Sequence, residues 1–447
     1  MQYASEKQYP VDLSHFNING RVFGALGAPE DSDQATVFHV KMETEIGREN
    51  PIRLKLPVVL PAMAKLNWQD YFAGAALAGV LAVIGEGAVD KDPGLVCENG
   101  KVKHCQLLKD MIGAFRTHSH GYGEIILQTN CDDDLRGVAE YAVAECGATA
   151  IEFKFGQSAK GIQAMGIVGS LEEAIRQKQA GNLILPDPED PQVQKEYSAG
   201  KGPHFRAYGR LPMWTEEYLT QRIAQLRSLG VKNVFFKMAG YDPQDMEKVL
   251  RIAAKAQVDM VTFDGAGGGS GNSPCKMMNE WCYPTIHMES ELYTICRRLE
   301  KEGIELPDIA VTGGIATEDQ MFKVLAFGAP YVTVVGIGRA AMAAAMTAKK
   351  VGELIEQGTV PKQYEKYGST VQEIFADLRE LRSVYGERAD QMAPGAVGVF
   401  SYLNRLHLGM RQFLALNRKF HVGYIGREDI FPLTYEAKDL LAGTYLK

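Results

Sequence analysis

The sequence predicts a (β/α)8 barrel, in which eight parallel strands alternate with helices. Eight short, apolar, β-prone runs recur along the middle of the chain, and each ends in glycine or a polar residue. Such runs are typical of strands that are buried on both faces. They span residues 57–64, 81–87, 124–129, 150–155, 233–240, 260–267, 308–315 and 331–338. The alternative is a doubly wound open sheet, but the count of eight and the glycine-rich ends of the last two runs favour the barrel.

Helical patterns lie between these runs and complete the alternation. They are expected at residues 68–79, 134–146, 215–229, 243–256, 286–302 and 317–327. Thr215 and Thr317 are predicted N-caps, because a threonine hydroxyl can accept a hydrogen bond from an unpaired N–H of the first turn. Gly328 is predicted to end the last of these helices.

The barrel is expected over residues 57–360, between two segments of different character. Residues 1–56 carry loop-like stretches and one apolar alternation near 36–42, which predict a covering segment with a hairpin. Residues 361–447 have helical patterns and predict a C-terminal helical extension. A long connection, 156–214, leaves the C-terminal end of the fourth strand, where the active sites of barrels lie. It contains a polar, proline-rich piece and is predicted to be a lid or an interface loop.

The composition excludes several classes of protein. The chain has 447 residues, of which 46% are hydrophobic, and a net charge of −7. These are ordinary globular values, which exclude disorder, coiled coil and collagen. No basic run stands out, so nucleic acid is not an expected partner. No stretch reaches the roughly 20 apolar residues of a membrane helix, so no membrane association is expected. The N-terminus has no secretory pattern, and a cytoplasmic protein is expected.

No metal site or disulfide is expected. The seven cysteines are scattered, and no CxxC spacing occurs, which indicates a reduced protein. His118 and His120 form an i, i+2 pair, but no acidic or cysteine ligand is spaced to match them. A Ser–His–Asp triad lacks support, because no GxSxG elbow occurs in a suitable context.

Two glycine-rich turns predict a phosphate site. The run VTGGI contains Gly313 and Gly314 at the end of the seventh strand, and VVGIGR contains Gly336, Gly338 and Arg339 at the end of the eighth. Glycines there let backbone N–H groups approach an anion, and the next helix N-terminus adds positive potential. Arg339 can supply a charge-assisted hydrogen bond. The alternative is that the glycines only make tight turns.

A third glycine-rich run follows the sixth strand. It reads FDGAGGGSGNSP over residues 263–274 and includes Asp264, Gly265, Gly267 and Gly268. A loop almost free of side chains suits a flat ring or a phosphate that lies on the backbone. A flexible loop without a ligand is the alternative.

Polar residues near other strand ends are candidates for the same site. Lys237 and Lys154 lie in apolar surroundings, where a lysine is costly unless it meets an anion. Lys237 could face the N1–C2=O edge of a flavin, or it could reach the barrel rim. Gln128 could hydrogen-bond the edge of a ring. Glu86, between two glycines, could act in proton transfer or form a structural salt bridge.

These residues together resemble a known family. The segments PAMA, GEG, IEFKFGQSAKG, DGAGGGSGNSP and GGIAT are similar to the FMN-binding synthase domain of glutamate synthase and occur in that family's order. The resemblance covers roughly residues 57–350 and, more loosely, the tail. It implies an FMN barrel that reduces 2-iminoglutarate, or a related N-substituted imine, to an amino acid with hydride from FMN N5.

The resemblance also implies roles for individual residues. Gln157 and Lys160 match the segment that binds the 2-oxo acid, and Glu86 matches the glutamate of the GEG turn. Ala62 and Met63 lie in the PAMA segment at the cofactor. Lys237 matches the strand lysine that faces FMN. The turns with Gly313, Gly314, Gly338 and Arg339 match the phosphate site.

The sequence also departs from the family. It begins Met-Gln, without the nucleophilic cysteine of a glutaminase domain, and no cysteine follows Cys296. We therefore expect no glutaminase domain and no iron–sulfur cluster. After Lys160, GIQAMG replaces the family's glycine-rich continuation, which leaves the substrate open to a relative such as N-methylglutamate. A stand-alone oligomeric enzyme with glutaminase-like or electron-donor partner subunits is expected.

Three alternative functions stay open. A hydroxy-acid oxidase would need a His–Arg pair near the seventh strand, and VTGGIATED has none. An IMP-dehydrogenase-like enzyme would need a catalytic cysteine after the sixth strand, where Cys275 lies close by. The third alternative is a non-catalytic barrel that serves as a scaffold.

Overall fold

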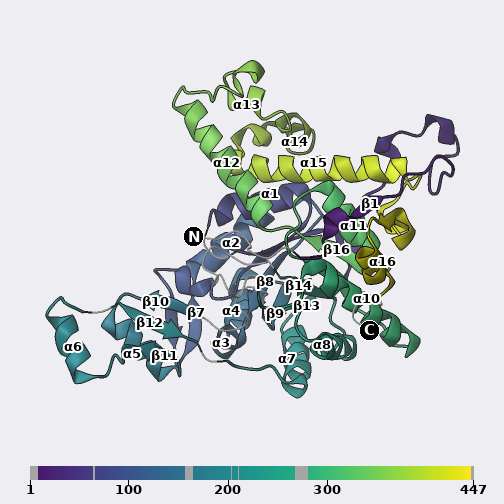
Figure 1. Ribbon diagram of the computed structural model, residues 1–447. Coiled ribbons are helices and arrows are strands. Elements are labelled where there is room, and N and C mark those ends of the chain that lie inside the picture. The colour runs from purple at the N-terminus through teal and green to yellow at the C-terminus, as the bar shows by residue number, and fades with distance from the viewer. Residues whose placement is uncertain are drawn as a thin grey trace.

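The computed structural model describes residues 9–63, 66–156, 165–202, 204–209, 211–266 and 280–443. Eight parallel strands form a closed barrel, and every predicted run supplies one strand (Figure 1). The strands are β4 (Val58–Met63), β5 (Leu81–Ile84), β8 (Ile125–Thr129), β9 (Ala150–Lys154), β13 (Asn233–Ala239), β14 (Met260–Asp264), β15 (Asp308–Thr312) and β16 (Val332–Gly336). The ring closes where Val335 of β16 pairs with Val58 of β4. The predicted barrel is confirmed, and the open sheet is wrong.

The predicted helices between the strands are also present. Within the described residues, and apart from the connection after β9, the α-helices from β4 to the end of the barrel are α1 (Trp68–Ala78), α2 (Gln106–Arg116), α3 (Cys131–Leu135), α4 (Val138–Cys146), α7 (Glu216–Ser228), α8 (Pro243–Lys255), α10 (Thr285–Lys301), α11 (Glu318–Gly328) and α12 (Arg339–Glu356). Thr215 accepts a hydrogen bond from the N–H of Tyr218, and Thr317 forms a capping box with Gln320. Both N-caps are confirmed.

Two boundaries differ from the prediction. The helix expected at 134–146 is divided into α3 and α4 by Gly137, whose φ of 68° is left-handed. Helix α11 ends at Gly328, one residue beyond the predicted bound of 327, and Ala329 is its C-cap. Pro330 follows two residues later and cannot continue a helix, since proline has no N–H to donate.

Side chains alternate along each barrel strand, with one set in the interior and one set under the helices. The interior set nearest the N-terminal ends is apolar and includes Val59, Val83, Ile126, Phe235, Met260, Ala310 and Val334. Strands β2 (Thr44–Ile46) and β3 (Ile52–Leu54) form an antiparallel hairpin whose Ile46, Ile52 and Leu54 pack on this layer. The predicted hairpin therefore closes the N-terminal end of the barrel. The alternation near 36–42 forms a 3-10 turn, Val37–His39, and lies outside the hairpin.

The C-terminal extension covers one side of the barrel. Its elements are α13 (Val371–Ile374), α14 (Leu378–Tyr385), α15 (Pro394–Leu416), β17 (Ile430–Pro432) and α16 (Tyr435–Ala442). The long helix α15 lies across α1 and α12 (Figure 1). Glycines permit this approach, since an added Cβ at Gly398 would lie 2.3 Å from the Cβ of Ala348. Strand β1 (Phe16–Ile18) pairs antiparallel with β17, so the N-terminal segment lies beside the extension.

The long connections after β5 and β9 contain structure of their own. The first holds a hairpin of β6 (Val96–Glu98) and β7 (Lys101–His104). The second folds into a small subdomain that projects away from the barrel, where the sequence predicts a lid or interface loop (Figure 1). Its elements are β10 (Met165–Val168), α5 (Leu171–Gln179), β11 (Leu183–Leu185), α6 (Pro191–Ser198) and β12 (Phe205–Tyr208). No helix in the described part of the chain is both long and apolar enough to cross a bilayer.

Candidate active site at the C-terminal ends of the strands

The inward side chains change from apolar to polar toward the C-terminal ends of the strands. Buried polar residues there are Gln128, Glu152, Lys154, Lys237, Thr262, Asp264 and Thr312. Strand register places Gln128 beside Glu152, and Lys237 between Lys154 and Thr262. Asp264 pairs in register with Thr312. The structure thus brings the predicted residues Gln128, Lys237 and Asp264 into one polar layer. This is the end of the barrel where enzymes of this fold hold their ligands.

Thr262, Thr312 and Glu152 are not among the residues predicted from the sequence, and the charged one of the three is Glu152. It is 1% exposed, and its Oε1 accepts a hydrogen bond from Nε2 of Gln128 at 2.6 Å. Burial raises the pKa of Glu152, whereas Lys237, Gln128 and Lys154 oppose the rise. The signal was present, because Glu152 and Lys154 are two residues apart in one strand and therefore share a face.

Glu86, at the end of β5, is part of an ion pair. Its carboxylate forms an ion pair with the ammonium of Lys154 from β9, and the Glu86 side chain remains 17% exposed. The indole N–H of Trp214 donates to the carbonyl of Lys154 at 2.8 Å and supports the end of β9. Of the two sequence alternatives for Glu86, the salt bridge is therefore present. An ion pair does not preclude proton transfer, because a partly exposed carboxylate at this position can still meet a ligand.

Packing explains three of the predicted glycines. A Cβ added to Gly265 would lie 2.3 Å from Oγ1 of Thr285, and a Cβ added to Gly313 would lie 2.5 Å from the same atom. At Gly336 it would lie 2.5 Å from the Cβ of Thr312. Thr285 also donates to the carbonyl of Gly313 at 2.8 Å. These glycines are required by the close approach of neighbouring turns, with or without a ligand.

Packing does not explain Gly314. Its φ is +83°, and an added Cβ would have no atom within 4 Å among the described residues, so the turn is open on this side. Gly338 is the N-cap of the 18-residue helix α12, and the exposed Arg339 is its first residue. The open turn and the start of a long helix together form a cradle that suits an anion.

The PAMA segment reaches the same end of the barrel. Ala62 packs against the interior cluster, and the carbonyl of Met63 accepts the N–H of Gly85 at 2.9 Å. An added Cβ at Gly338 would lie 3.2 Å from Cγ of Pro61, so the end of β4 adjoins the start of α12. The predicted site residues Gln157, Lys160, Gly267 and Gly268, and also Cys275, lie outside the described residues.

The residues present fit the predicted cofactor, FMN. Oε1 of Gln128 and Oγ1 of Thr262 are buried and have no hydrogen-bond partner among the described residues. Buried polar atoms normally have partners, so unpaired ones at the mouth of a barrel indicate a polar ligand. Lys237, in register with Thr262, supplies positive charge beside them. The open Gly314 turn can take the phosphate of the same ligand.

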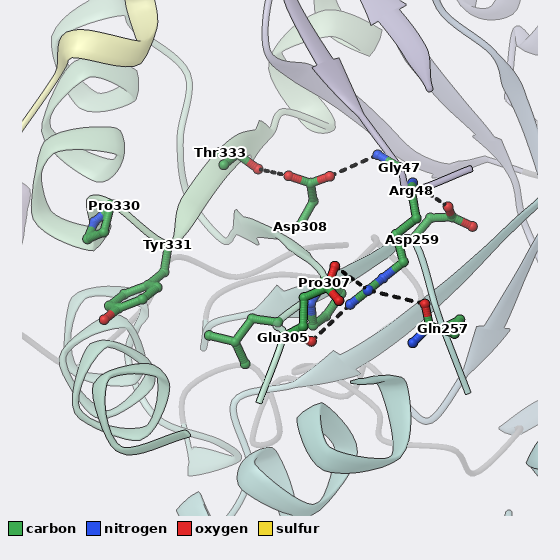
Figure 2. Close-up of a pocket in the computed structure, with 11 residues that line it drawn as sticks. Gly47, Arg48, Gln257, Asp259, Glu305, Pro307, Asp308, Pro330, Tyr331 and Thr333 are labelled. Carbon is green, nitrogen blue, oxygen red and sulfur yellow. Dashed lines mark hydrogen bonds and ion pairs between the residues drawn. The ribbon is translucent and has the colours of Figure 1, made fainter. Parts of the chain in front are cut away.

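A pocket at the opposite end of the barrel has a structural role. Figure 2 shows it between the β2–β3 hairpin and the N-terminal ends of β14, β15 and β16. Asp308 accepts the N–H of Gly47 at 2.8 Å and the hydroxyl of Thr333 at 3.1 Å. Arg48 donates to the carbonyls of Val258 and Glu305. The polar groups there anchor the hairpin to the barrel.

One segment of the chain matches a known protein family. Residues 210–350 match the sequence model of a family described as "Conserved region in glutamate synthase". This match covers less than half of the 447 residues, so it shows that this segment is similar to the glutamate synthase region. The predicted resemblance is thereby confirmed for the segment that includes Lys237, Asp264, Gly314 and Arg339. No curated protein sequence matches the chain.

Solved structures share the fold of this chain. The flavin-binding domain of baker's yeast flavocytochrome b2 is 12% identical, with a TM-score of 0.52 over 94% of this chain and 76% of that one. A doubly substituted flavocytochrome b2 with sulfite bound is 11% identical, with a TM-score of 0.51 over 94% and 77%. The same variant with pyruvate bound is 11% identical, with a TM-score of 0.51 over 94% of this chain and 76% of that one. At such identities the similarity concerns the fold alone.

Proposed function

We propose that this chain is an FMN-dependent oxidoreductase of the glutamate synthase type that reduces a 2-imino acid to an amino acid. One observation carries the proposal. The segment that matches the glutamate synthase region supplies Lys237, Thr262 and the open Gly314 turn, and these lie at one end of a closed barrel. The flavin-binding domain that shares the fold supports the choice of a flavin.

In this proposal the chain holds the two ends of FMN with different groups. The phosphate binds at the Gly314 turn and the start of α12, near Arg339. The ring system meets Gln128, Thr262 and Lys237, whose polar atoms are buried at the mouth. Bound there and reduced by an electron donor, FMN would supply a hydride from N5 to the imine carbon.

The side chains contribute charge and water exclusion. Lys237 stabilises negative charge at the nearby edge of the ring system, because an ammonium in a dry site interacts strongly with an anion. Glu86 faces the imine nitrogen and stabilises its protonated form, which is the better hydride acceptor. Lys154 forms an ion pair with Glu86 and holds its carboxylate at the end of β5. Gln157 and Lys160 remain the proposed ligands of the acid groups.

Two alternatives are less well supported. Hydroxy-acid oxidation would require a His–Arg pair after β15, and residues 313–317 contain neither residue. The IMP-dehydrogenase-like alternative depends on Cys275, which lies outside the described residues. The nearby Cys282 is a poor substitute, because burial raises the pKa of its thiol to about 12. We further propose that a partner subunit delivers electrons to the flavin and that another supplies ammonia or an amine.

The visible spectrum of the purified protein tests this proposal. We expect a flavin spectrum, and we expect the pigment released by denaturation to be FMN, since the open turn suits a phosphate. A protein that is colourless and that binds no added FMN would favour the scaffold alternative. Stoichiometric FAD in place of FMN would also contradict the proposal.

A further inference from the structure

A buried carboxylate without a role so far lies next to the Glu86 turn. Asp133 is the third residue of α3 and is 3% exposed. Its Oδ2 accepts the N–H of Gly87 at 2.9 Å and lies 3.5 Å from the backbone nitrogen of Asn130. One carboxylate thus joins the turn after β5 to the start of the helix after β8. Glu86 is held on its other side by Lys154 from β9.

We propose that Asp133 is a positioning residue for Glu86, which fixes the backbone of the Glu86 turn and sets the electrostatic field at its carboxylate. The proposal rests on the proposed function, in which Glu86 faces the imine nitrogen. The geometry supports it, because a hydrogen bond to the residue directly after Glu86 restricts how that turn can move. A deeply buried carboxylate also acts through a less polarisable medium than a solvated one.

The charges around Asp133 determine when it is ionised. Burial raises the pKa of Asp133 to about 7, Glu86 and Asp90 add to the rise, and the N–H of Gly87 opposes it. Asp90 is paired with Arg136 at 2.7 Å. On the helix of Asp133 itself, Asp134 is paired with Arg222 at 2.8 Å, and Asp132 is another acidic residue of the first turn. Asp133 therefore changes charge near neutral pH.

The ionisation of Asp133 has a defined effect on the proposed reaction. Above the pKa of about 7, its negative charge adds to that of Glu86 and further stabilises a protonated imine. Below it, Asp133 is neutral and this contribution is absent. The rate of reduction should therefore rise as pH increases through this value.

Infrared spectroscopy of the protein tests the coupling without any activity measurement. The carbonyl band of protonated Asp133, identified by its absence in Asp133→Asn, should disappear with a midpoint near pH 7. Glu86→Gln should move the midpoint to lower pH, since a neighbouring negative charge is removed. Asp90→Asn is the control, and its shift should be smaller because Asp90 raises the pKa of Asp133 less than Glu86 does.

Kinetics then test the functional consequence. In Asp133→Asn the amide oxygen can still accept the N–H of Gly87, so the turn is preserved and only the charge is lost. We expect an unchanged kcat at about pH 6, a kcat lowered roughly tenfold at about pH 8, and an unchanged KM. Asp133→Ala, which also removes the acceptor, should lower kcat at both pH values.

Two results would overturn the proposal. One is an infrared midpoint that Glu86→Gln leaves in place. The other is a kcat of Asp133→Asn that falls by the same factor at both pH values, which would indicate a purely structural role. If the protein binds no flavin, the proposed function fails, and the infrared midpoints still decide whether Asp133 and Glu86 are coupled.

Discussion

Nε2 of Gln128 donates a hydrogen bond to Oε1 of Glu152 at 2.6 Å, across neighbouring strands β8 and β9. Glu152 is fully buried, and burial raises its pKa. The positive charges of Lys237 and Lys154 oppose this rise. Lys237 therefore acts within a set of opposed charges rather than as an isolated cation. This changes what a substitution of Lys237 should do.

The reduction potential of the flavin should follow the sum of these charges. Lys237→Met should lower the potential by roughly 30 mV, which corresponds to about 1.4 kcal/mol for a two-electron couple. Glu152→Gln should raise it, and the variant with both changes should return close to the original value. Potentiometric titration of FMN-loaded protein measures all three. Three potentials equal to that of the unsubstituted protein would show that neither residue lies near the ring.

The phosphate cradle is tested by a pair of glycines with the same backbone conformation. Gly314 and Gly303 have φ values of +83° and +79°, and neither has an atom within 4 Å of an added Cβ. Alanine at either position costs about 1–2 kcal/mol of stability. Only Gly314→Ala should also weaken FMN binding, by roughly tenfold, because the methyl group occupies the space of the phosphate. Equal FMN affinities of the two variants, measured by flavin fluorescence, would argue against the cradle.

The C-terminal extension should support the same cradle through one hydrogen bond. Tyr402 of α15 donates to the carbonyl of Ala316, just after the Gly314 turn, at 2.5 Å. Tyr402→Phe should destabilise the fold by about 1 kcal/mol and weaken FMN binding several-fold. Tyr385→Phe is a matched control, because Tyr385 donates to the carbonyl of His118 at the same distance, away from the turn. If both variants keep full FMN affinity, the extension does not support the site.

Loss of the contacts that anchor the β2–β3 hairpin should lower the stability of the fold and leave FMN binding unchanged. Asp308→Ala removes the acceptor of Gly47 N–H and Thr333 hydroxyl and should cost about 1–3 kcal/mol. Burial raises the pKa of Asp308, so the folded state binds this proton more tightly than the unfolded state. Its contribution to stability is present below the unfolded pKa of about 4 and is lost as pH rises through the folded pKa. Urea unfolding at a series of pH values should show that the free energy of unfolding depends less on pH in Asp308→Asn than in the unsubstituted protein. Loss of FMN from this variant would contradict a structural role for Asp308.

The sequence predicts the barrel because parallel strands buried on both faces leave continuous apolar runs. An apolar run does not show which of its few polar side chains face the barrel interior. Glu152 was therefore not predicted, although it lies two residues from Lys154. The subdomain at 165–208 was missed because strands of three or four residues leave too little periodicity to detect. The split at Gly137 was missed since one glycine inside a helical pattern is usually tolerated. The sequence could not show that packing requires glycine at positions 265, 313 and 336. The side chains that crowd these positions belong to Thr285 and Thr312, which come close only in the folded structure.

The central claim is that this barrel exchanges hydride between FMN and the carbon of an amino or imino acid. The most direct measurement is anaerobic mixing of the FMN-loaded protein with L-glutamate, N-methylglutamate or L-lactate while the flavin spectrum is followed. We expect one of the two amino acids to bleach the flavin, because amine oxidation is the reverse of imine reduction, and we expect lactate to leave the spectrum unchanged. Bleaching by lactate, with both amino acids inert, would contradict the central claim.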